Sequence, residues 1–260
     1  MAVIGGARDM NKWSSLLRAA GTNRRFPGES SEYRSARDEL LKAEADLRRL
    51  NEEVAAQRRA LPLGGLIPED YAFEAAGSGR TVRFSELFAP GKDTLVVYSM
   101  MFPRWSEDPR ASAPGRMALL PMDEQPCPSC TSVVDGIDGF VQHLAARVNV
   151  AVVAKTSAPR LGAYAADRGW HNLQYMQLLS APNNTFNRDY HAETPDGEQV
   201  PMLNVFSREQ DGIHHRWGAE LMFDGGDSRH LDSIWPIWSV LDLTPDGRGA
   251  AAAYPTGQYA

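Results

Sequence analysis

The sequence predicts an α/β fold in which helices flank a central mixed sheet, with a long charged helix on its N-terminal side. Two observations lead to this class. Apolar runs typical of strands alternate with helical patterns after residue 70, and residues 31–61 contain neither glycine nor proline. The 260 residues suffice for one large domain with appended arms.

The sequence of the N-terminal part predicts an arm followed by a helix. Residues 1–30 are rich in glycine, serine, arginine and asparagine without a clear period, so we expect a loosely ordered arm there. Good helix formers over 31–62 predict one long helix, with Ser31 as its cap and Pro62 at its end.

The apolar residues of this helix alternate in steps of three and four and form a narrow seam on one face. They are Leu40, Ala43, Leu47, Leu50, Val54 and Leu61. A seam of this kind predicts a partner. Two partners remain open, the body of the same chain or the same helix of a second copy, which would make residues 31–61 the interface of a homodimer.

The main domain is expected over 63–250, followed by a tail over 251–260. Its first elements are a hairpin, a helical turn and a buried strand, at 71–75, 80–84, 85–88 and 94–100. Next come a helix, a strand and a helix, at 131–148, 149–155 and 159–169. A second hairpin and a last helix follow, at 202–206, 213–217 and 231–243. This order is typical of a thioredoxin-type sheet.

The segment 103–126 interrupts this pattern. It is longer than ordinary connections and contains Pro103, Pro109, Pro114, Pro121 and Pro126. Because it leads directly into the two cysteines, we interpret it as an inserted loop that covers them.

Composition limits the partners. Lys and Arg number 27 against 33 Asp and Glu, so the net charge of −6 offers no basic face for a nucleic acid. The first residues do not resemble a signal peptide, and the longest apolar run, around 95–102, is far shorter than the ~20 residues of a membrane span. We therefore expect a cytoplasmic protein without a membrane partner, in a compartment where thiols stay reduced.

The chemistry of the chain centres on Cys127-Pro128-Ser129-Cys130, placed between a buried strand and a helix. Free backbone N–H groups and the dipole at a helix start favour a thiolate, so the pKa of Cys127 is expected below the ~8.5 of a free thiol. Cys130, one turn further on, is placed to resolve a mixed disulfide. Pro128 suits the first helical position, whereas the charges of Asp123 and Glu124 oppose the effect.

Two other readings of the cysteine pair remain open: an inert reduced pair, or half of a zinc site. No two histidines have the spacing of a zinc finger. The candidates are His143, His171, His191, His214, His215 and His230. We favour redox chemistry, which needs no cofactor here.

Several residues are candidates for contact with a substrate. Val200-Pro201 precedes the predicted strand 202–206. At this place thioredoxin-type folds carry a cis proline, which lies against the dithiol and leaves a backbone edge for a substrate. Both isomers remain open here. The candidate substrate site also includes Pro128, Ser129, Trp105 and Tyr98. A strand tyrosine such as Tyr98 is, however, more often part of the core.

Two further hypotheses are weaker. His143, on the helix after the dithiol, is expected in solvent, with a role as general base for Cys130 as the alternative. A peroxidase of the peroxiredoxin type needs Pro and Thr or Ser seven and three residues before its cysteine. Those positions hold Leu120 and Glu124 before Cys127, and Asp123 and Cys127 before Cys130, so the motif is absent.

Taken together, several stretches resemble a bacterial thioredoxin-like family known as domain of unknown function 899, over roughly 31–248. They are Arg58-Arg59-Ala60-Leu61-Pro62, 95–102 with Trp105, the Cys127–Cys130 pair, Gly169-Trp170, Phe186-Asn187-Arg188-Asp189-Tyr190 and Leu241-Asp242-Leu243-Thr244-Pro245. The resemblance implies a thioredoxin-like fold and a dithiol–disulfide oxidoreductase without an established substrate. The long segment 103–126 departs from the short link that members usually have before the cysteines.

These observations predict a thiol–disulfide oxidoreductase in which Cys127 is the nucleophile and Cys130 resolves. Its partners would be a disulfide-containing protein or a small thiol substrate, and an external reductant. The alternative is a non-catalytic thioredoxin-fold protein that binds a partner or serves as a dimeric scaffold.

Overall fold

The computed structural model describes residues 25–105, 107–108, 120–121, 124–181, 183–224 and 228–247. Most of the expected N-terminal arm, most of the segment 103–126 and the whole tail 251–260 therefore lie outside the described residues. The chain divides into two compact units, residues 1–61 and 62–260. Among the described residues, no helix combines the length and the apolarity that a membrane crossing requires.

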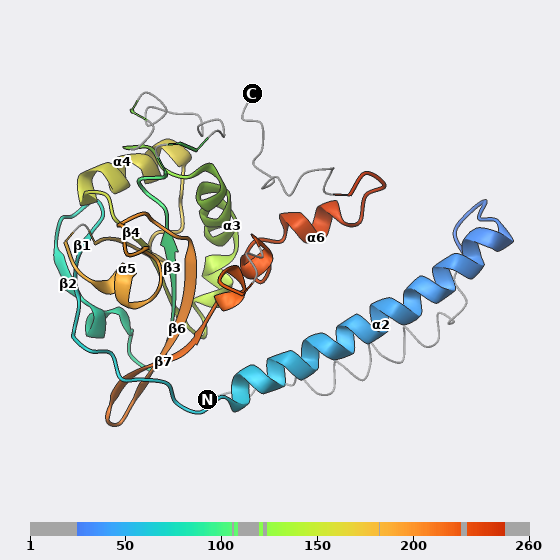
Figure 1. Ribbon diagram of the computed structural model, residues 1–260, viewed down its shortest axis with the longest axis horizontal. Helices are drawn as coiled ribbons and strands as arrows, with labels where there is room; N and C mark the ends of the chain where they lie inside the picture. The colour runs from blue at the N-terminus through green and yellow to red at the C-terminus, as the bar shows by residue number, and fades with distance from the viewer. Residues whose placement is uncertain are drawn as a thin grey trace. The chain divides into compact units, whose positions relative to one another are not determined.

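The described part of the first unit consists mainly of one helix, α2, Ser31–Ala60, the blue ribbon in Figure 1. Its cap is Ser30 and not the expected Ser31, because the Ser30 hydroxyl accepts a hydrogen bond from the Tyr33 backbone N–H at 3.0 Å. At the other end Pro62 lacks the N–H that would continue the helix. The predicted long charged helix is confirmed.

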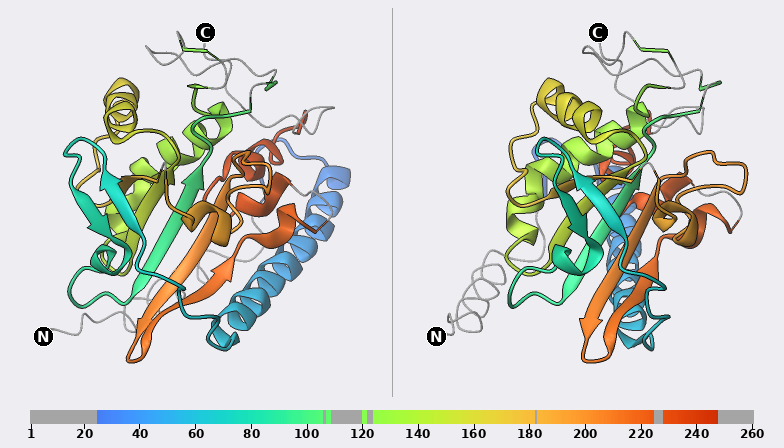
Figure 2. Two further views of the ribbon diagram at one scale, coloured as in Figure 1. Left: turned by 60° about the vertical axis from the view of Figure 1, so that its left-hand side comes forward. Right: turned by 90° about the vertical axis from the view of Figure 1, so that its left-hand side faces the viewer.

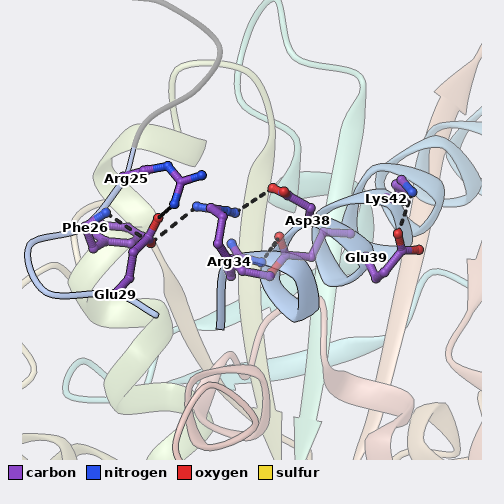
Figure 3. A network of polar contacts seen from close by, with 9 residues as sticks. Arg25, Phe26, Glu29, Arg34, Asp38, Glu39 and Lys42 are labelled. Atoms are coloured by element: carbon purple, nitrogen blue, oxygen red, sulfur yellow. Dashed lines mark hydrogen bonds and ion pairs between the residues drawn. The ribbon is translucent and has the colours of Figure 1, made fainter. Parts of the chain in front are cut away.

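A buried carboxylate fixes the turn that enters α2 (Figure 3). The Glu29 side chain is 4% exposed and pairs with Arg34 at 3.6 Å. It also accepts a hydrogen bond from the Phe26 backbone N–H at 3.1 Å, and Arg34 pairs further with Asp38 at 2.8 Å. By contrast Leu40, Leu47 and Leu50 of the seam are exposed.

The second unit is built on a seven-stranded sheet in the order β2-β1-β5-β4-β3-β6-β7. The strands are β1 Ala72–Ala75, β2 Thr81–Arg83, β3 Thr94–Met100, β4 Asn149–Ala154, β5 Gln177–Ser180, β6 Met202–Glu209 and β7 Gly212–Gly218. The helices and 3₁₀ turns are η1 Phe84–Leu87, α3 Pro128–Leu144, α4 Ala158–Arg168, α5 Phe186–Asp189, η4 Glu220–Met222, η5 Ser228–Leu231 and α6 Ile237–Leu241.

The topology is that of a thioredoxin-like fold. Strand β3 is an inner strand, parallel to β4 and antiparallel to β6, and α3 connects β3 to β4. Figure 2 shows the hairpin of β6 and β7, in orange, beside β3, in green. The predicted α/β class with a central mixed sheet is therefore confirmed.

The sheet is buried on both faces, which explains the nearly continuous apolar runs of β3 and β4. Tyr98, Val152 and Leu203 join one core cluster with residues of α3, α4 and the C-terminal turns. The alternate residues of these strands, such as Val97 and Val153, point to the other face of the sheet and join a second cluster with η1 and α5. Helix α3 thus packs on the face that carries Tyr98.

Three elements differ from the sequence-based expectation. The last helix, predicted over 231–243, is split into η5 and α6, because Pro236 cannot donate a helical hydrogen bond and becomes the cap of α6. The helical spacing indicates a helix over 131–148, whereas α3 begins at Pro128, the first helical position expected for this proline, and ends at Leu144. Strand β5 was not predicted, since its short buried run shows no period.

Candidate functional site

The dithiol lies where the inner strand β3 leads into helix α3. The Cys127 backbone N–H donates to the Met101 carbonyl at 2.9 Å, just beyond the end of β3. The Thr131 hydroxyl donates to the Cys127 carbonyl at 2.9 Å and lies 2.7 Å from the Tyr164 hydroxyl of α4. Neighbouring elements therefore hold the first turn of α3 on two sides.

Cys127 is the N-cap residue of α3, as the sequence predicts. Its backbone is extended, and its sulfur accepts a hydrogen bond from the Cys130 backbone N–H at 3.5 Å. Pro128 takes the first helical position, where its missing N–H costs nothing. A charge on the Cys127 sulfur would thus face a backbone amide and the positive end of the helix dipole. Glu124, expected to oppose this charge, pairs with Arg160 at 2.9 Å, and Asp123 lies outside the described residues.

Cys130 has a different environment. Burial raises the pKa of its thiol well above the ordinary value, and a hydrogen bond to Cys127 and the charge of Cys127 raise it further. Hydrogen bonds from the Tyr98 hydroxyl and from the Met101 backbone N–H, 3.4 Å from the sulfur, act in the opposite direction. Cys130 therefore holds its proton more firmly than an ordinary thiol does.

The two cysteines form no disulfide and both are buried, with exposed fractions of 0% for Cys127 and 1% for Cys130. The two ends of the preceding segment are tied together. The Arg104 backbone N–H donates to the Gln125 carbonyl at 2.8 Å, and its guanidinium donates to the Gln125 side chain at 2.9 Å. Attack on an external disulfide therefore requires local opening at Cys127.

The structure decides between the two isomers that the sequence left open at Val200-Pro201. This peptide bond is trans, and the cis bond found among the described residues joins Phe102 to Pro103. The Val200 N–H donates to the Ala192 carbonyl at 2.9 Å, and the Pro201 carbonyl lies 3.1 Å from His230 Nε2. Two polar groups of the edge expected for substrate pairing are thus used within the chain.

A small cavity brings most of the predicted site residues together. Tyr98, Trp105, Ser129, Cys130 and Pro201 line it, whereas Cys127, Pro128 and Val200 are not among its lining residues. Tyr98 belongs to the core, as favoured from the sequence, and also borders the dithiol through Cys130. Trp105 is 37% exposed and its indole N–H donates to the Gln199 carbonyl at 3.3 Å.

His230 is the site residue that the sequence did not reveal. It lies in η5, about 100 positions after Cys130, is 5% exposed, and lines the same cavity. No spacing motif connects the two residues, so only the fold brings them together. His143, considered as a base for Cys130, is exposed on α3. Within the described parts of the chain, no three His, Cys, Asp or Glu side chains are placed to hold a metal ion.

Comparison with known proteins gives one extensive match. The model of a family described as "Bacterial protein of unknown function (DUF899)" matches residues 23–259. No curated protein matches. Among solved structures, a mutant of peroxiredoxin Q from Xanthomonas campestris is 14% identical, with coverage of 61% of this chain and 85% of its own, and it superposes with a TM-score of 0.39.

Two other solved structures show similar values. Peroxidoxin BcpB of Mycobacterium tuberculosis is 14% identical, with coverage of 68% of this chain and 98% of its own, and a TM-score of 0.39. The exposed lipoprotein thioredoxin Etrx1 of Streptococcus pneumoniae is 13% identical, with coverage of 56% and 85% and a TM-score of 0.32.

Proposed function

The chain belongs to the bacterial family of unknown function DUF899, and we propose that it is a thiol–disulfide oxidoreductase that works through Cys127 and Cys130. The observation that carries this proposal is the pairing of two unlike thiols. One sulfur caps the start of α3, and the other is a buried thiol that hydrogen-bonds to it. Thiol exchange needs this division between an attacking and a resolving sulfur.

In the first step the Cys127 thiolate attacks one sulfur of a substrate disulfide. A bond forms between Cys127 and that sulfur, the substrate S–S bond breaks, and the other half leaves as a thiolate. The amide of Cys130 and the start of α3 stabilise the attacking thiolate. Local opening at Cys127 admits the substrate.

In the second step Cys130 loses its proton and attacks the Cys127 sulfur. The new bond closes the Cys127–Cys130 disulfide, and the second half of the substrate leaves as a thiol. Once the first thiolate has taken a proton from water, the substrate has gained two electrons and two protons. An external dithiol reductant restores the starting pair by the same exchange in reverse.

The substrate side of the site follows from the same geometry. We assign contact with the substrate to the partly exposed Trp105 and to Ser129, with Pro128, Tyr98, Val200 and Pro201 around them. A disulfide-containing protein or a small disulfide is the proposed substrate class. The proposed location is the cytoplasm, where a reductant keeps the two cysteines in the reduced dithiol form.

Trapping the mixed disulfide tests this function. The chain has only these two cysteines, so no other thiol contributes to the signal. In Cys130→Ser, we expect Cys127 to form a stable adduct with a small disulfide under native conditions, detected as a mass increase of the intact protein. In Cys127→Ser, we expect adduct formation to slow at least about 100-fold, because Cys130 keeps its proton.

The burial of Cys127 also favours a second candidate, a non-catalytic binding protein or scaffold. The same experiment separates the two. A scaffold predicts that Cys130→Ser reacts only after denaturation, whereas the oxidoreductase reacts while folded. Reaction confined to the denatured protein would therefore exclude the enzyme.

A further inference from the structure

The cavity beside Cys130 offers about 10 Å³ to the centre of a water molecule. Its wall is mainly apolar, formed by residues such as Met101, Val133, Leu231 and Trp235. Three titratable side chains face it, those of Tyr98, Cys130 and His230. This volume is at the lower limit for one water, and these polar groups are of the kind that hold one.

The geometry of the resolving step indicates which group leaves on the side of the cavity. When Cys130 attacks the Cys127 sulfur, the attacking, central and leaving sulfurs lie nearly in line. The leaving thiol therefore departs on the side of Cys127 that faces away from Cys130. Since the cavity borders Cys130 and not Cys127, it does not hold the leaving group. What must leave on the Cys130 side is its proton.

His230 is built to take that proton. Its Nε2 lies 3.1 Å from the Pro201 carbonyl, and because a carbonyl can only accept, Nε2 carries the hydrogen. In the neutral ring the basic nitrogen is then Nδ1. Pro201 directly precedes β6, the neighbour of β3, so the ring is anchored to the same part of the sheet as Tyr98.

We propose that His230 accepts the proton of Cys130 through one water in this cavity while Cys130 closes the disulfide, and that the Tyr98 hydroxyl stabilises the thiolate. The inference rests on the proposed function. The electron pair of the Cys130 sulfur forms the new bond to Cys127, and the bond from Cys127 to the substrate sulfur breaks. His230 holds the proton and then returns it to the leaving thiolate through solvent.

The arginine next to His230 lies in ion pairs. On its own turn, Arg229 pairs with Asp232 at 2.6 Å and with Asp242 at 2.9 Å. From η4, the charge of Glu220 acts on His215 of the neighbouring strand β7, whose pKa is lowered by burial and is raised only in part by Glu220. From β3 and α3, Tyr98 and Cys130 are the titratable groups that share the cavity with His230.

The reaction of the reduced full-length protein with the neutral disulfide 2,2′-dithiodipyridine tests this inference, because each step releases one coloured thione. The first release reports the attack by Cys127 and the second reports ring closure by Cys130. In His230→Gln, whose amide can still donate to Pro201, we expect the second release to slow about tenfold or more near pH 7. The first release should stay within about twofold of the wild type. His143→Gln, an exposed histidine on the dithiol helix, is the matched control and should leave both releases unchanged.

The pH profile separates proton transfer from a structural effect. For the wild type, the second release should level off with rising pH once His230 is neutral, whereas in His230→Gln it should keep rising about tenfold per pH unit with hydroxide. Tyr98→Phe should slow the second release and keep the wild-type plateau. A wild-type profile without a plateau, or an unchanged second release in His230→Gln, would overturn the relay. Absence of the first release would overturn the proposed function itself.

Discussion

Cys127 and Cys130 have the same side chain, three positions apart, and differ only in their surroundings. Both side chains belong to the same core cluster, but the Cys127 sulfur faces a backbone amide at the start of α3, whereas Cys130 lies beside the Tyr98 hydroxyl. Burial penalises the charged form of Cys130, and the charge of its neighbour adds to this penalty. At the scale of single residues, the environment of Cys130 therefore makes this thiol hold its proton more firmly than an ordinary thiol.

This difference predicts how stability depends on pH. Because the pKa of Cys130 is raised on folding from its ordinary value of 9.0, the unfolded chain loses a proton that the folded chain retains. The contribution of the protonated Cys130 thiol to the free energy of unfolding is complete below pH 9 and is lost as the pH rises. Under reducing conditions, the free energy of unfolding of the wild type should fall more steeply above about pH 9 than that of Cys130→Ala, by up to about 1.4 kcal/mol per pH unit.

Denaturant unfolding between pH 8 and about 10 measures this slope. Val134→Ala, another fully buried residue of α3, is the control. It should be less stable at every pH and should keep the slope of the wild type. Equal slopes for the wild type and Cys130→Ala would contradict the assigned direction of the pKa.

At the scale of elements, the outer edge of the sheet is covered by the chain that enters the second unit. The Gly64 N–H donates to the His215 carbonyl at 3.1 Å, and the His215 N–H donates to the Gly65 carbonyl at 3.0 Å. The Ile67 N–H donates to the Ile213 carbonyl at 2.9 Å. Residues 64–67 thus bond along β7, which would otherwise be an edge open to aggregation.

Gly64 is needed for this close approach. A Cβ at this position would lie 2.4 Å from the His215 carbonyl oxygen, whereas a Cβ at Gly65 would meet nothing within 4 Å. We expect Gly64→Ala to lower the free energy of unfolding by about 1–3 kcal/mol and Gly65→Ala to change it by less than about 0.5 kcal/mol. Chemical denaturation of both variants measures the difference. Equal stabilities would show that the segment does not approach β7 so closely in solution.

At the scale of the whole molecule, helix α2 carries an apolar seam along one face. Leu40, Leu47 and Leu50 are exposed, and charged pairs such as Arg49–Glu53, at 3.3 Å, lie along the same helix. Apolar residues repeated in steps of three and four on a charged helix are typical of a coiled coil. A second copy of the chain is therefore the partner that we propose for the seam.

Sedimentation tests this assembly with the full-length chain. The wild type should sediment as a dimer, and the double substitution Leu47→Glu with Leu50→Glu should sediment as a monomer, because it places charges along the seam. Leu41→Glu changes an equally exposed leucine outside the seam and should leave the dimer intact. A monomeric wild type, or a dimer that survives the double substitution, would exclude this interface.

What the sequence determined by itself is the part of the structure encoded in local patterns. The absence of glycine and proline predicts α2, and apolar β-branched runs predict β3 and β4. The same local logic places Cys127 at the start of α3, because a proline that follows the cysteine suits the first helical position. The mixed α/β class follows from the order of these elements.

The tertiary structure alone decided how distant residues meet. It buried Cys127, made the Val200–Pro201 bond trans and brought His230 beside Cys130. Hydrophobic periodicity reports which face of an element is apolar, and it carries no information about which element covers that face. The pairing of β3 with β6 and the packing of η5 against α3 supply that information, because they join residues about 100 positions apart.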